Sequence, residues 1–229
     1  MPDTALPTTP PTPAKAAKPV LLDKAGATAL LASYGKPREL TVKKDIGRID
    51  QHMAKFISLA PLCLVSTADK SGKQDVGPRG DPPGAFKVLD EHTIAFADRP
   101  GNNRLDTLTN LVENPEIALL FLLPGIGETV RVAGTASLSV DPELLAAMAV
   151  QGKPPLCAIV VHVRQAYLHC AKALLRSKFW SGEYAVAKDA FPSIVRMIAD
   201  QVGMGGADIE ANEKRVEKNY RDGLWSHTT

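Results

Sequence analysis

The spacing of the apolar residues changes at Leu62, and this change constrains the fold more than any other feature of the sequence. Before it, apolar residues recur at three- and four-residue steps: Ile46, Ile49, Met53, Phe56 and Ile57. Such steps are typical of an amphipathic helix, and Pro61 is expected to end it because proline cannot donate a backbone hydrogen bond. After it, short segments alternate apolar and polar side chains, as half-buried strands do. The chain therefore predicts helices first and a β core afterwards.

Six or seven segments after this point predict strands: residues 62–67, 74–79, 86–89, 93–97, 117–123, 129–140 and 156–168. Their connections are short, and a turn is predicted at 70–73. Within 129–140, the residues predicted to share one face are Val130, Val132, Ala136, Leu138 and Val140. The pattern favours an antiparallel barrel over a parallel doubly wound sheet, in a fold that is mainly β with helices (α+β).

Residues 96–108 predict the end of a strand, a Pro-Gly turn and the start of a helix. Asn102 or Asn103 is expected to cap that helix, whose apolar face would be Leu105, Leu108, Leu111 and Val112. The unpaired N–H groups at a helix start attract anions, and Arg99 and Arg104 add charge beside them. The segment is therefore either a phosphate-binding site or an ordinary capped helix with solvated arginines.

The patterns divide the chain into four parts. Residues 1–20 are rich in Pro, Thr and Ala and predict a disordered tail. Residues 21–60 form an N-terminal helical segment, residues 61–170 the β core, and residues 171–229 a C-terminal helical extension. In that extension, 193–202 predicts a helix that stops at Gly203, and 209–221 predicts a charged surface helix.

The composition describes a globular protein with one main core, since 45% of the 229 residues are hydrophobic. A net charge of only +2 predicts neither nucleic acid nor a membrane as a partner. No apolar run approaches the roughly 20 residues that span a bilayer, and we see no secretory signal. Three cysteines without a C-x-x-C pair fit a reducing compartment, so we expect a cytoplasmic protein.

No metal site is predicted, because His162 and His169 would point to opposite faces of an unbroken strand. Cys170 lies beside His169 and near Lys172, which would suit a thiol of lowered pKa, but a structural role is the favoured interpretation. The sequence lacks a phosphate-binding loop of the G-x-x-x-x-G-K-[ST] type, a Rossmann turn after a strand, and a G-x-S-x-G nucleophile elbow.

Four blocks of sequence together resemble one family. They are residues 77–84, residues 98–122, residues 131–136 and residues 169–180. The second block contains residues 98–108, then Glu113-Asn114-Pro115 and the predicted strand 117–122. They are similar to the pyridoxamine 5′-phosphate oxidase-like, FMN-binding split-barrel family, and within it to a subgroup of uncharacterised FMN-dependent flavoproteins. The resemblance covers about residues 45–185. It implies an antiparallel split β-barrel with residues 61–170 as the FMN-binding core, and a homodimer with two FMN sites at its interface.

The resemblance also assigns residues to the cofactor. Arg79 matches the family's strand arginine that holds the FMN phosphate, while Asn102, Asn103 and Arg104 match the cluster that opens the following helix. Two asparagines replace the usual Ser and Arg, so Arg79, Arg99 and Arg104 are the available cations. Forked guanidinium groups and backbone N–H groups suit a phosphate.

Other positions are expected around the rest of the cofactor. Asp98 belongs to the same helix-opening block, and the backbone near Gly80 and Asp81 would edge the isoalloxazine ring. The residues expected from the partner subunit are Lys172, Arg176 and Trp180, with Arg131 nearby.

The function that the resemblance implies is an FMN-dependent oxidoreductase acting on an unidentified small molecule, with NADH or NADPH as the candidate electron donor. The C-terminus lacks the Arg-Leu-x-x-x-Arg type of segment with which true pyridoxamine phosphate oxidase grips its substrate, so that activity is not expected. No catalytic acid or base is assigned. The alternatives are an F420-dependent reductase and a flavin- or haem-binding carrier without turnover.

Overall fold

The computed structural model describes residues 18–225, so the predicted disordered tail, residues 1–20, lies outside the described residues except for its last three. Three helices precede the sheet: α1 (Lys24–Ser33), α2 (Glu39–Lys43) and α3 (Gln51–Leu59). The strands are β1 (Leu62–Ala68), β2 (Gln74–Gly80), β3 (Lys87–Asp90), β4 (Thr93–Ala97), β5 (Glu116–Leu122), β6 (Thr129–Ser139) and β7 (Ala158–His169). The other helices are α4 (Asp106–Glu113), α5 (Pro142–Ala147), α6 (Lys172–Arg176), the 3₁₀ helix η1 (Lys188–Ala190), α7 (Ile194–Val202) and α8 (Gly206–Asp222).

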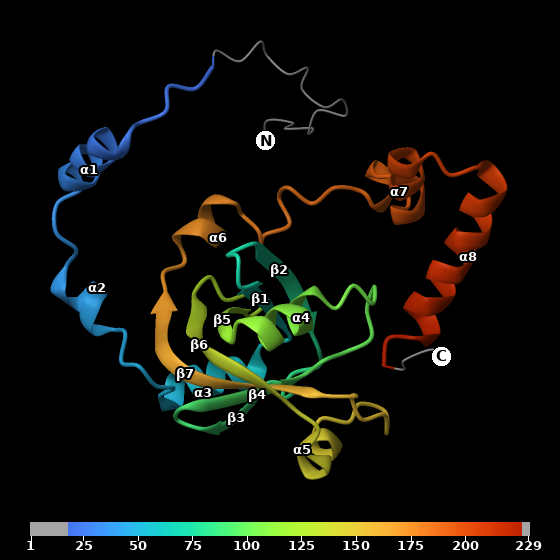
Figure 1. The fold of residues 1–229 in the computed structure, drawn as a ribbon, viewed down its shortest axis with the longest axis horizontal. Coiled ribbons are helices and arrows are strands. Elements are labelled where there is room, and N and C mark those ends of the chain that lie inside the picture. Colours follow the sequence, from blue (N-terminus) through green and yellow to red (C-terminus); the bar gives the residue numbers. More distant parts are fainter. Residues whose placement is uncertain (1–17, 226–229) are drawn as a thin grey trace.

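The strands form one antiparallel sheet in the order β2-β1-β5-β6-β7-β4-β3, which curls around its apolar face (Figure 1). Short turns join β1 to β2, β3 to β4 and β5 to β6, as antiparallel pairing allows. The predicted antiparallel barrel of the α+β class is confirmed, and every predicted strand lies within two residues of its expected bounds.

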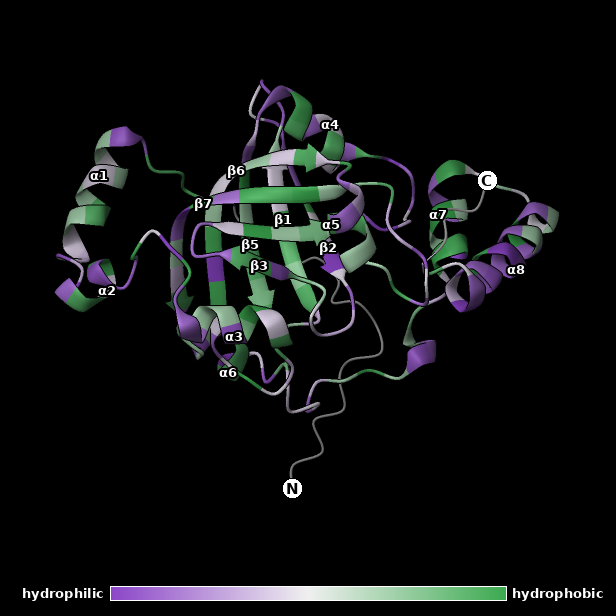
Figure 2. Ribbon diagram, turned by 90° about the horizontal axis from the view of Figure 1, so that it is seen from below, coloured by the Kyte–Doolittle hydropathy of each residue, from purple (hydrophilic) through white to green (hydrophobic). Residues whose placement is uncertain are grey.

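The core fills the inside of the curled sheet, because alternate side chains of a strand point to one face. In β1, Cys63 and Val65 are fully buried. Three phenyl rings meet there: the ring centroid of Phe86 lies 5.2 Å from that of Phe121, edge-on, and 6.0 Å from that of Phe96. Figure 2 shows the apolar residues concentrated on the strands and on α3, which packs beneath the sheet in that view.

Helix α3 begins at Gln51, later than the apolar spacing from Ile46 predicts. Gly47 adopts a φ of 67°, which a continuing helix does not allow, and the Asp50 carboxylate then accepts a hydrogen bond from the N–H of Met53 at 2.8 Å. Ile46 is consequently 42% exposed. The helix residues that reach the core are Met53 and Ile57.

A β-bulge interrupts the pairing of β6 with β7, where the register shifts between Ala133 and Gly134 and leaves Arg164 without an opposite residue. Only glycine fits at position 134, since a Cβ there would lie 1.9 Å from the carbonyl oxygen of His162. The extra residue inverts the alternation along β7, and His162 and His169 are both exposed. The prediction that they face opposite ways, which assumed an unbroken strand, is wrong. Within residues 18–225, no three His, Cys, Asp or Glu side chains gather closely enough to hold a metal ion.

The far end of β6 is less buried than its start. Leu138 and Val140 were expected to share a face with Val130, and although Val130 is buried they are 41% and 73% exposed. The pairing of β5 with β6 stops at Thr135, so the last residues of β6 have a neighbouring strand on one side only. Without that neighbour, their side chains are not covered.

Helical extensions flank the barrel on opposite sides in Figures 1 and 2. Helices α1 and α2 bury none of their side chains. Helices α7 and α8 pack against each other, and α7 has its predicted ends, with Ser193 as its N-cap and Gly203 in the left-handed conformation after it. The predicted charged helix is α8, which also buries none of its side chains. None of the helices in the described chain is both long and apolar enough to span a bilayer.

Candidate functional site

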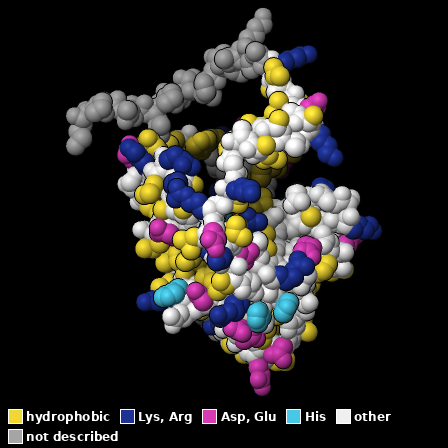
Figure 3. Space-filling model, turned by 90° about the vertical axis from the view of Figure 1, so that its left-hand side faces the viewer, with side chains coloured by type: hydrophobic (Ala, Val, Ile, Leu, Met, Phe, Trp, Pro, Cys, Tyr) yellow, Lys and Arg dark blue, Asp and Glu magenta, His cyan; other side chains and the backbone are white. Residues whose placement is uncertain are grey.

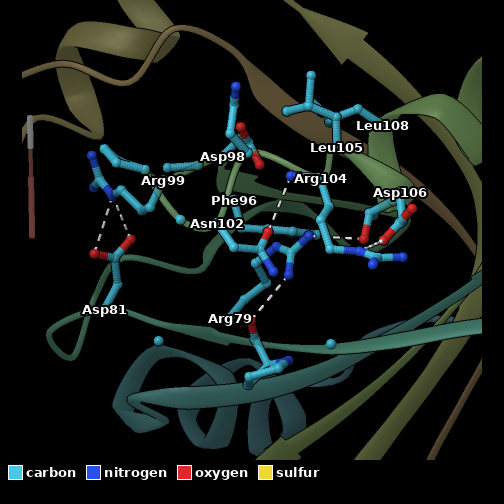
Figure 4. A pocket seen from close by; sticks show the side chains of 18 of the residues that line it. Arg79, Asp81, Phe96, Asp98, Arg99, Asn102, Arg104, Leu105, Asp106 and Leu108 are labelled. Atoms are coloured by element: carbon cyan, nitrogen blue, oxygen red, sulfur yellow. Dashed lines mark hydrogen bonds and ion pairs between the residues drawn. The ribbon is translucent and has the colours of Figure 1, made fainter. Parts of the chain in front are cut away.

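A pocket of about 1100 Å³ opens between β2, the loop from β4 to α4 and the end of α8. Its volume is slightly above the range of roughly 300–1,000 Å³ that small-molecule sites occupy. Figure 4 shows its charged side chains, which come from the end of β2 and the residue after it, from the β4–α4 loop and from the start of α4. The lining residues are Asp75 to Asp81, Ala85, Phe86, Phe96 to Leu108, Asn219, Leu224 and Trp225.

Helix α4 is fixed against the sheet by polar contacts, and this places its first turn at the pocket. The Asn110 side-chain amide donates a hydrogen bond to the Thr67 hydroxyl at 3.0 Å, and both residues are buried. One turn earlier, the Thr107 hydroxyl donates to Asp75 on β2 at 3.0 Å. Because buried polar groups need partners, these contacts favour one position of α4 on the sheet.

The start of α4 differs from the prediction. Neither Asn102 nor Asn103 caps the helix, because Leu105 occupies the N-cap position with a φ of 60° and without a side-chain hydrogen bond to the helix. The Asn102 side chain instead accepts a hydrogen bond from the N–H of Arg104 at 3.1 Å. Asn103 also has a positive φ, of 58°. A leucine in the left-handed region is uncommon, and such strain concentrates at binding sites.

The predicted apolar face of α4 is therefore rotated. Leu105 and Val112 are 50% and 77% exposed, although both were expected to face the core. The buried residues are Thr107, Asn110 and Leu111, with Leu108 partly buried beside them. The helix turns a partly polar side toward the sheet because β1 and β2 offer Thr67 and Asp75 there as hydrogen-bonding partners.

Arg99 is a largely buried residue that supports the pocket wall. Its Nε donates to the Asp81 carboxylate at 2.9 Å, and its Nη2 donates to the carbonyl of Met148, next to α5, at 2.7 Å. The Arg99 and Asp81 side chains are only 10% and 7% exposed. Burial raises the pKa of Asp81, while the hydrogen bond and charge of Arg99 act in the opposite direction. Arg99 thus ties the β4–α4 loop to the end of β2.

Arg104 lies at the rim. Its Nε donates to the Asp106 carboxylate at 2.7 Å, and its side chain is 70% exposed. The hydrogen bond from Arg104 lowers the pKa of Asp106. Arg104 therefore shares its charge with a neighbouring carboxylate, in a pair that water surrounds.

Arg79 differs from both because it forms no ion pair within residues 18–225. Its Nη2 donates to the Thr107 hydroxyl at 2.8 Å and its Nη1 to its own neighbour, the Pro78 carbonyl, at 3.0 Å. Its Nε is buried and has no hydrogen-bond partner in the described chain. A buried unpaired N–H is costly, so this donor at the start of α4 is suited to an anion.

The sequence-predicted residues fall into two groups. The pocket brings together Arg79, Gly80, Asp81, Asp98, Arg99, Asn102, Asn103 and Arg104. The remaining four, which do not line it, are Arg131, Lys172, Arg176 and Trp180. Of these, Arg131 is an exposed residue of β6, and the indole N–H of Trp180 donates to the carbonyl of Ile126 in the β5–β6 turn at 2.8 Å.

Sequence reasoning missed several residues of the pocket. Thr107 links Arg79 to Asp75 through its hydroxyl. Sequence reasoning missed it because the predicted helix start was too early, so Thr107 was not placed in the first turn of α4. Trp225 lies with its ring centroid 5.6 Å from the Arg99 guanidinium. Phe86 and Phe96 form the apolar floor between the pocket and the core. Trp225 left no sequence signal, since its contact spans more than half of the chain.

Comparison with known proteins identifies relatives of this fold. The family model described as pyridoxamine 5′-phosphate oxidase matches residues 49–170, more than half of the chain. Among solved structures, HupZ from Group A Streptococcus has 20% identity and a TM-score of 0.43, with 52% of this chain and 91% of that chain covered.

Two other solved structures are more distant. An F420 reductase has 16% identity and a TM-score of 0.36, with 50% of this chain and 94% of that chain covered. HutZ, the haem storage protein from Vibrio cholerae, has 12% identity and a TM-score of 0.36, with 53% and 94% covered. No curated protein sequence matches. At these identities and TM-scores, the three structures carry no information about the chemistry of this chain.

Proposed function

The chain belongs to the pyridoxamine 5′-phosphate oxidase family, and from that premise we propose that it binds FMN in the pocket and acts as an FMN-dependent oxidoreductase on a small molecule. The α+β split-barrel fold that the sequence resemblance implies is confirmed by the family match and by the seven-stranded sheet. The cofactor and the reaction are the parts that we propose.

One observation carries the proposal: the half-buried Arg79 forms no ion pair with a described residue, and its buried Nε lies without a partner beside the first turn of α4. The two other arginines of the pocket are each bound to a carboxylate, Arg99 to Asp81 and Arg104 to Asp106, although Nη1 of Arg99 is also buried without a partner among the described residues. A phosphate group would supply the missing acceptor to Arg79 and would also meet the free N–H groups of the helix start. The residues thus fit the phosphate end of FMN.

The rest of the pocket fits a planar ring system. When bound, the flavin supplies the redox chemistry, and the protein supplies orientation and exclusion of water. Phe86 and Phe96 offer an apolar floor, while the Asp81–Arg99 pair keeps the end of β2 and the β4–α4 loop in place. The Trp225 ring lies against the Arg99 guanidinium and adds an aromatic wall to the pocket.

A homodimer is a further part of the proposal, and it rests on the sequence resemblance. Arg131, Lys172, Arg176 and Trp180 do not line the pocket of their own chain. We propose that a second copy brings its Lys172, Arg176 and Trp180 to this pocket, as the resemblance implies. NADH or NADPH is the proposed electron donor.

The test is the absorption spectrum of the purified protein, followed by titration of the apo protein with FMN. We expect a flavin spectrum, and we expect Arg79→Ala to raise the dissociation constant for FMN by about ten- to over a hundredfold, since it removes a charge-assisted hydrogen bond. The matched control is Arg48→Ala, which removes an exposed arginine paired with Glu91 at 3.0 Å and should leave FMN binding unchanged.

The same measurements distinguish the alternatives. A deazaflavin spectrum would assign an F420-dependent reductase, and a haem spectrum would assign a carrier. Bound FMN that no pyridine nucleotide and no substrate reduces would also indicate a carrier without turnover. A colourless protein that fails to bind added FMN would overturn the proposal.

A further inference from the structure

A second, smaller cleft of about 540 Å³ lies between α3 and β3. We call it the α3–β3 cleft, and its volume is within the range of roughly 300–1,000 Å³ that small-molecule sites occupy. Phe86 lines both this cleft and the larger pocket, and it is the one residue that the two have in common. Apart from this wall, the α3–β3 cleft is therefore separate from the proposed FMN site.

Backbone hydrogen bonds at both ends of α3 keep the walls of the cleft in place. At the end of the helix, the N–H of Gly84 donates to the carbonyl of Ser58 at 2.7 Å. Just before its start, the N–H of Ile49 donates to the carbonyl of Glu91, between β3 and β4, at 2.7 Å. Between these points, two side chains of α3 are buried in the core. The helix is thus tied to the chain on either side of β3, and the cleft is formed without a ligand.

The local sequence explains why this space is not filled. Ala54 lines the cleft and packs against the core, but its methyl group is too small to fill the space beside β3. In β3, the register shifts between Val88 and Asp90, so Leu89 has no opposite residue in β4 and is 50% exposed. Together with Phe86, these side chains give the cleft an apolar lining, which suits the apolar body of a small molecule.

Two lysines add charge to the apolar lining, Lys55 from α3 and Lys87 from β3. Neither forms an ion pair within residues 18–225, and none of the described residues that line the cleft is acidic. By contrast, Figure 3 shows basic and acidic side chains close together in the lower half of the face it presents, and Arg48 is paired with Glu91 at 3.0 Å. Two cations without a neighbouring carboxylate create a positive potential that favours an anionic group.

We propose that the α3–β3 cleft binds a small molecule that combines an apolar body with a carboxylate. The apolar lining covers the body, and the ammonium groups of Lys55 and Lys87 donate hydrogen bonds to the carboxylate oxygens. The Ser58 hydroxyl already donates to the carbonyl of Lys55 at 2.8 Å, so the two lysines supply the specificity for charge. The proposal goes beyond the FMN site, since the cleft forms within one chain and needs no cofactor.

The test uses naphthalene-2-carboxylate as the probe and 2-naphthalenemethanol, which has the same rings without the charge, as the control ligand. Both are titrated by calorimetry into the full-length protein with excess FMN present, so that the larger pocket is not available to them. We expect saturable binding of one carboxylate probe per chain. The alcohol should bind about tenfold more weakly, because it forms no ion pair with either lysine.

Charge-removing variants test the two lysines. Lys55→Met and Lys87→Met should each weaken binding of the carboxylate probe about threefold and leave binding of the alcohol unchanged, since each removes one partly solvated ion pair. The matched control is Lys70→Met, which removes an exposed lysine of the β1–β2 turn, 4.0 Å from Glu113, and should bind both ligands like the wild type.

A blocking variant tests the place of binding. Ser58 is an exposed residue of α3 that lines the cleft, so the indole of Ser58→Trp should fill the space and abolish binding of both ligands. Melting curves establish that each variant is folded, and the two lysine variants carry the test if Ser58→Trp is not.

Three results would overturn the proposal. The first is no saturable binding of the carboxylate probe, or equal affinity for the alcohol. The second is unchanged affinity for the carboxylate probe in folded Lys55→Met and Lys87→Met. The third is undiminished binding in folded Ser58→Trp. Loss of FMN binding in Arg79→Ala with unchanged binding of the carboxylate probe to this cleft would leave the α3–β3 site standing, so the two proposals fail separately.

Discussion

The turn between β1 and β2 and the loop between β4 and α4 both redirect the chain, but they do so by different means. In the first, the Asp69 carboxylate accepts hydrogen bonds from the N–H of Ser71 at 2.8 Å and from the N–H of Lys73 at 3.0 Å, and Gly72 takes a φ of 86°. Each unusual conformation falls on a residue that tolerates it. The turn is therefore stabilised by its own sequence.

The β4–α4 loop depends on residues far away in the sequence. Leu105 is held in the left-handed region, and the loop is fixed by Arg99, which binds Asp81 and the carbonyl of Met148. Neither partner lies in the loop. In the β1–β2 turn, residues of the turn itself supply the hydrogen-bond partners. The β4–α4 loop at the pocket instead contains a strained residue, and contacts with residues outside the loop keep it in place.

The largest expected effect comes from removing the support of that loop. Arg99→Ala leaves the Asp81 carboxylate, 7% exposed, without its cation, and breaking such a buried pair typically costs about 3–5 kcal/mol. We expect a loss of unfolding free energy of this size in urea denaturation. If Arg99→Ala were as stable as the wild type, the β4–α4 loop would not depend on Arg99, and its contrast with the β1–β2 turn would not hold.

Arg104→Ala is the matched control for this prediction. It removes an arginine of the same loop, also paired with a carboxylate, but the pair is exposed and surrounded by water. Surface ion pairs contribute little to stability, so the melting temperature should not change measurably. FMN affinity should fall only a few-fold, because Asp106 already shares the charge of Arg104.

The self-contained turn is tested by Asp69→Ala, which removes the acceptor for Ser71 and Lys73. We expect the melting temperature at neutral pH to fall by a few degrees, less than in Arg99→Ala. The hydrogen bond from the Ser71 hydroxyl and those from the backbone lower the pKa of Asp69 below its ordinary value of 3.8.

The pH dependence follows from the sign of that shift. A carboxylate with a lowered pKa in the folded state stabilises above its ordinary pKa, and this contribution is lost as the pH falls through the folded value. The difference in stability between the wild type and Asp69→Ala should therefore be constant at neutral pH and shrink below about pH 4. A difference that persisted at lower pH would mean that the carboxylate charge does not hold this turn.

The smallest effect is expected from relieving the strain at Leu105. Glycine has no steric penalty in the left-handed region, and Leu105 is half exposed, so little packing is lost. We expect Leu105→Gly to raise the unfolding free energy by about 0.5–1 kcal/mol, the net of relieved strain and added chain entropy. Gly72→Ala should lower the unfolding free energy. If both substitutions changed the unfolding free energy equally and in the same direction, the contrast between the two regions would not hold.

The same contrast explains what the sequence can predict. The strands, the β1–β2 turn and the cap of α7 at Ser193 depend on neighbouring residues, and they lie where the pattern places them. The start of α4 was wrong because Thr67 and Asp75, on other strands, select which side of the helix is buried. The bulge at Arg164 was missed because it depends on the close approach of Gly134 to a second strand.

The candidate site follows the same rule. Arg79 and the helix-opening residues were named from the sequence, and the pocket brings them together. The pairing of Arg99 with Asp81, and hence the unpaired state of Arg79, could not be predicted, because both depend on where the end of β2 meets the β4–α4 loop. Trp225 could not be predicted for the same reason.

The central claim is that Arg79 and the start of α4 bind the phosphate of FMN, and a cycle with two ligands and two proteins tests it most directly. Riboflavin carries the same ring system as FMN without the phosphate. Calorimetric titration of the wild type should show much tighter binding of FMN than of riboflavin, and Arg79→Ala should reduce that preference about ten- to over a hundredfold while riboflavin affinity stays the same. If Arg79→Ala kept the full preference for FMN, the phosphate seat would lie elsewhere and the account of this pocket would be contradicted.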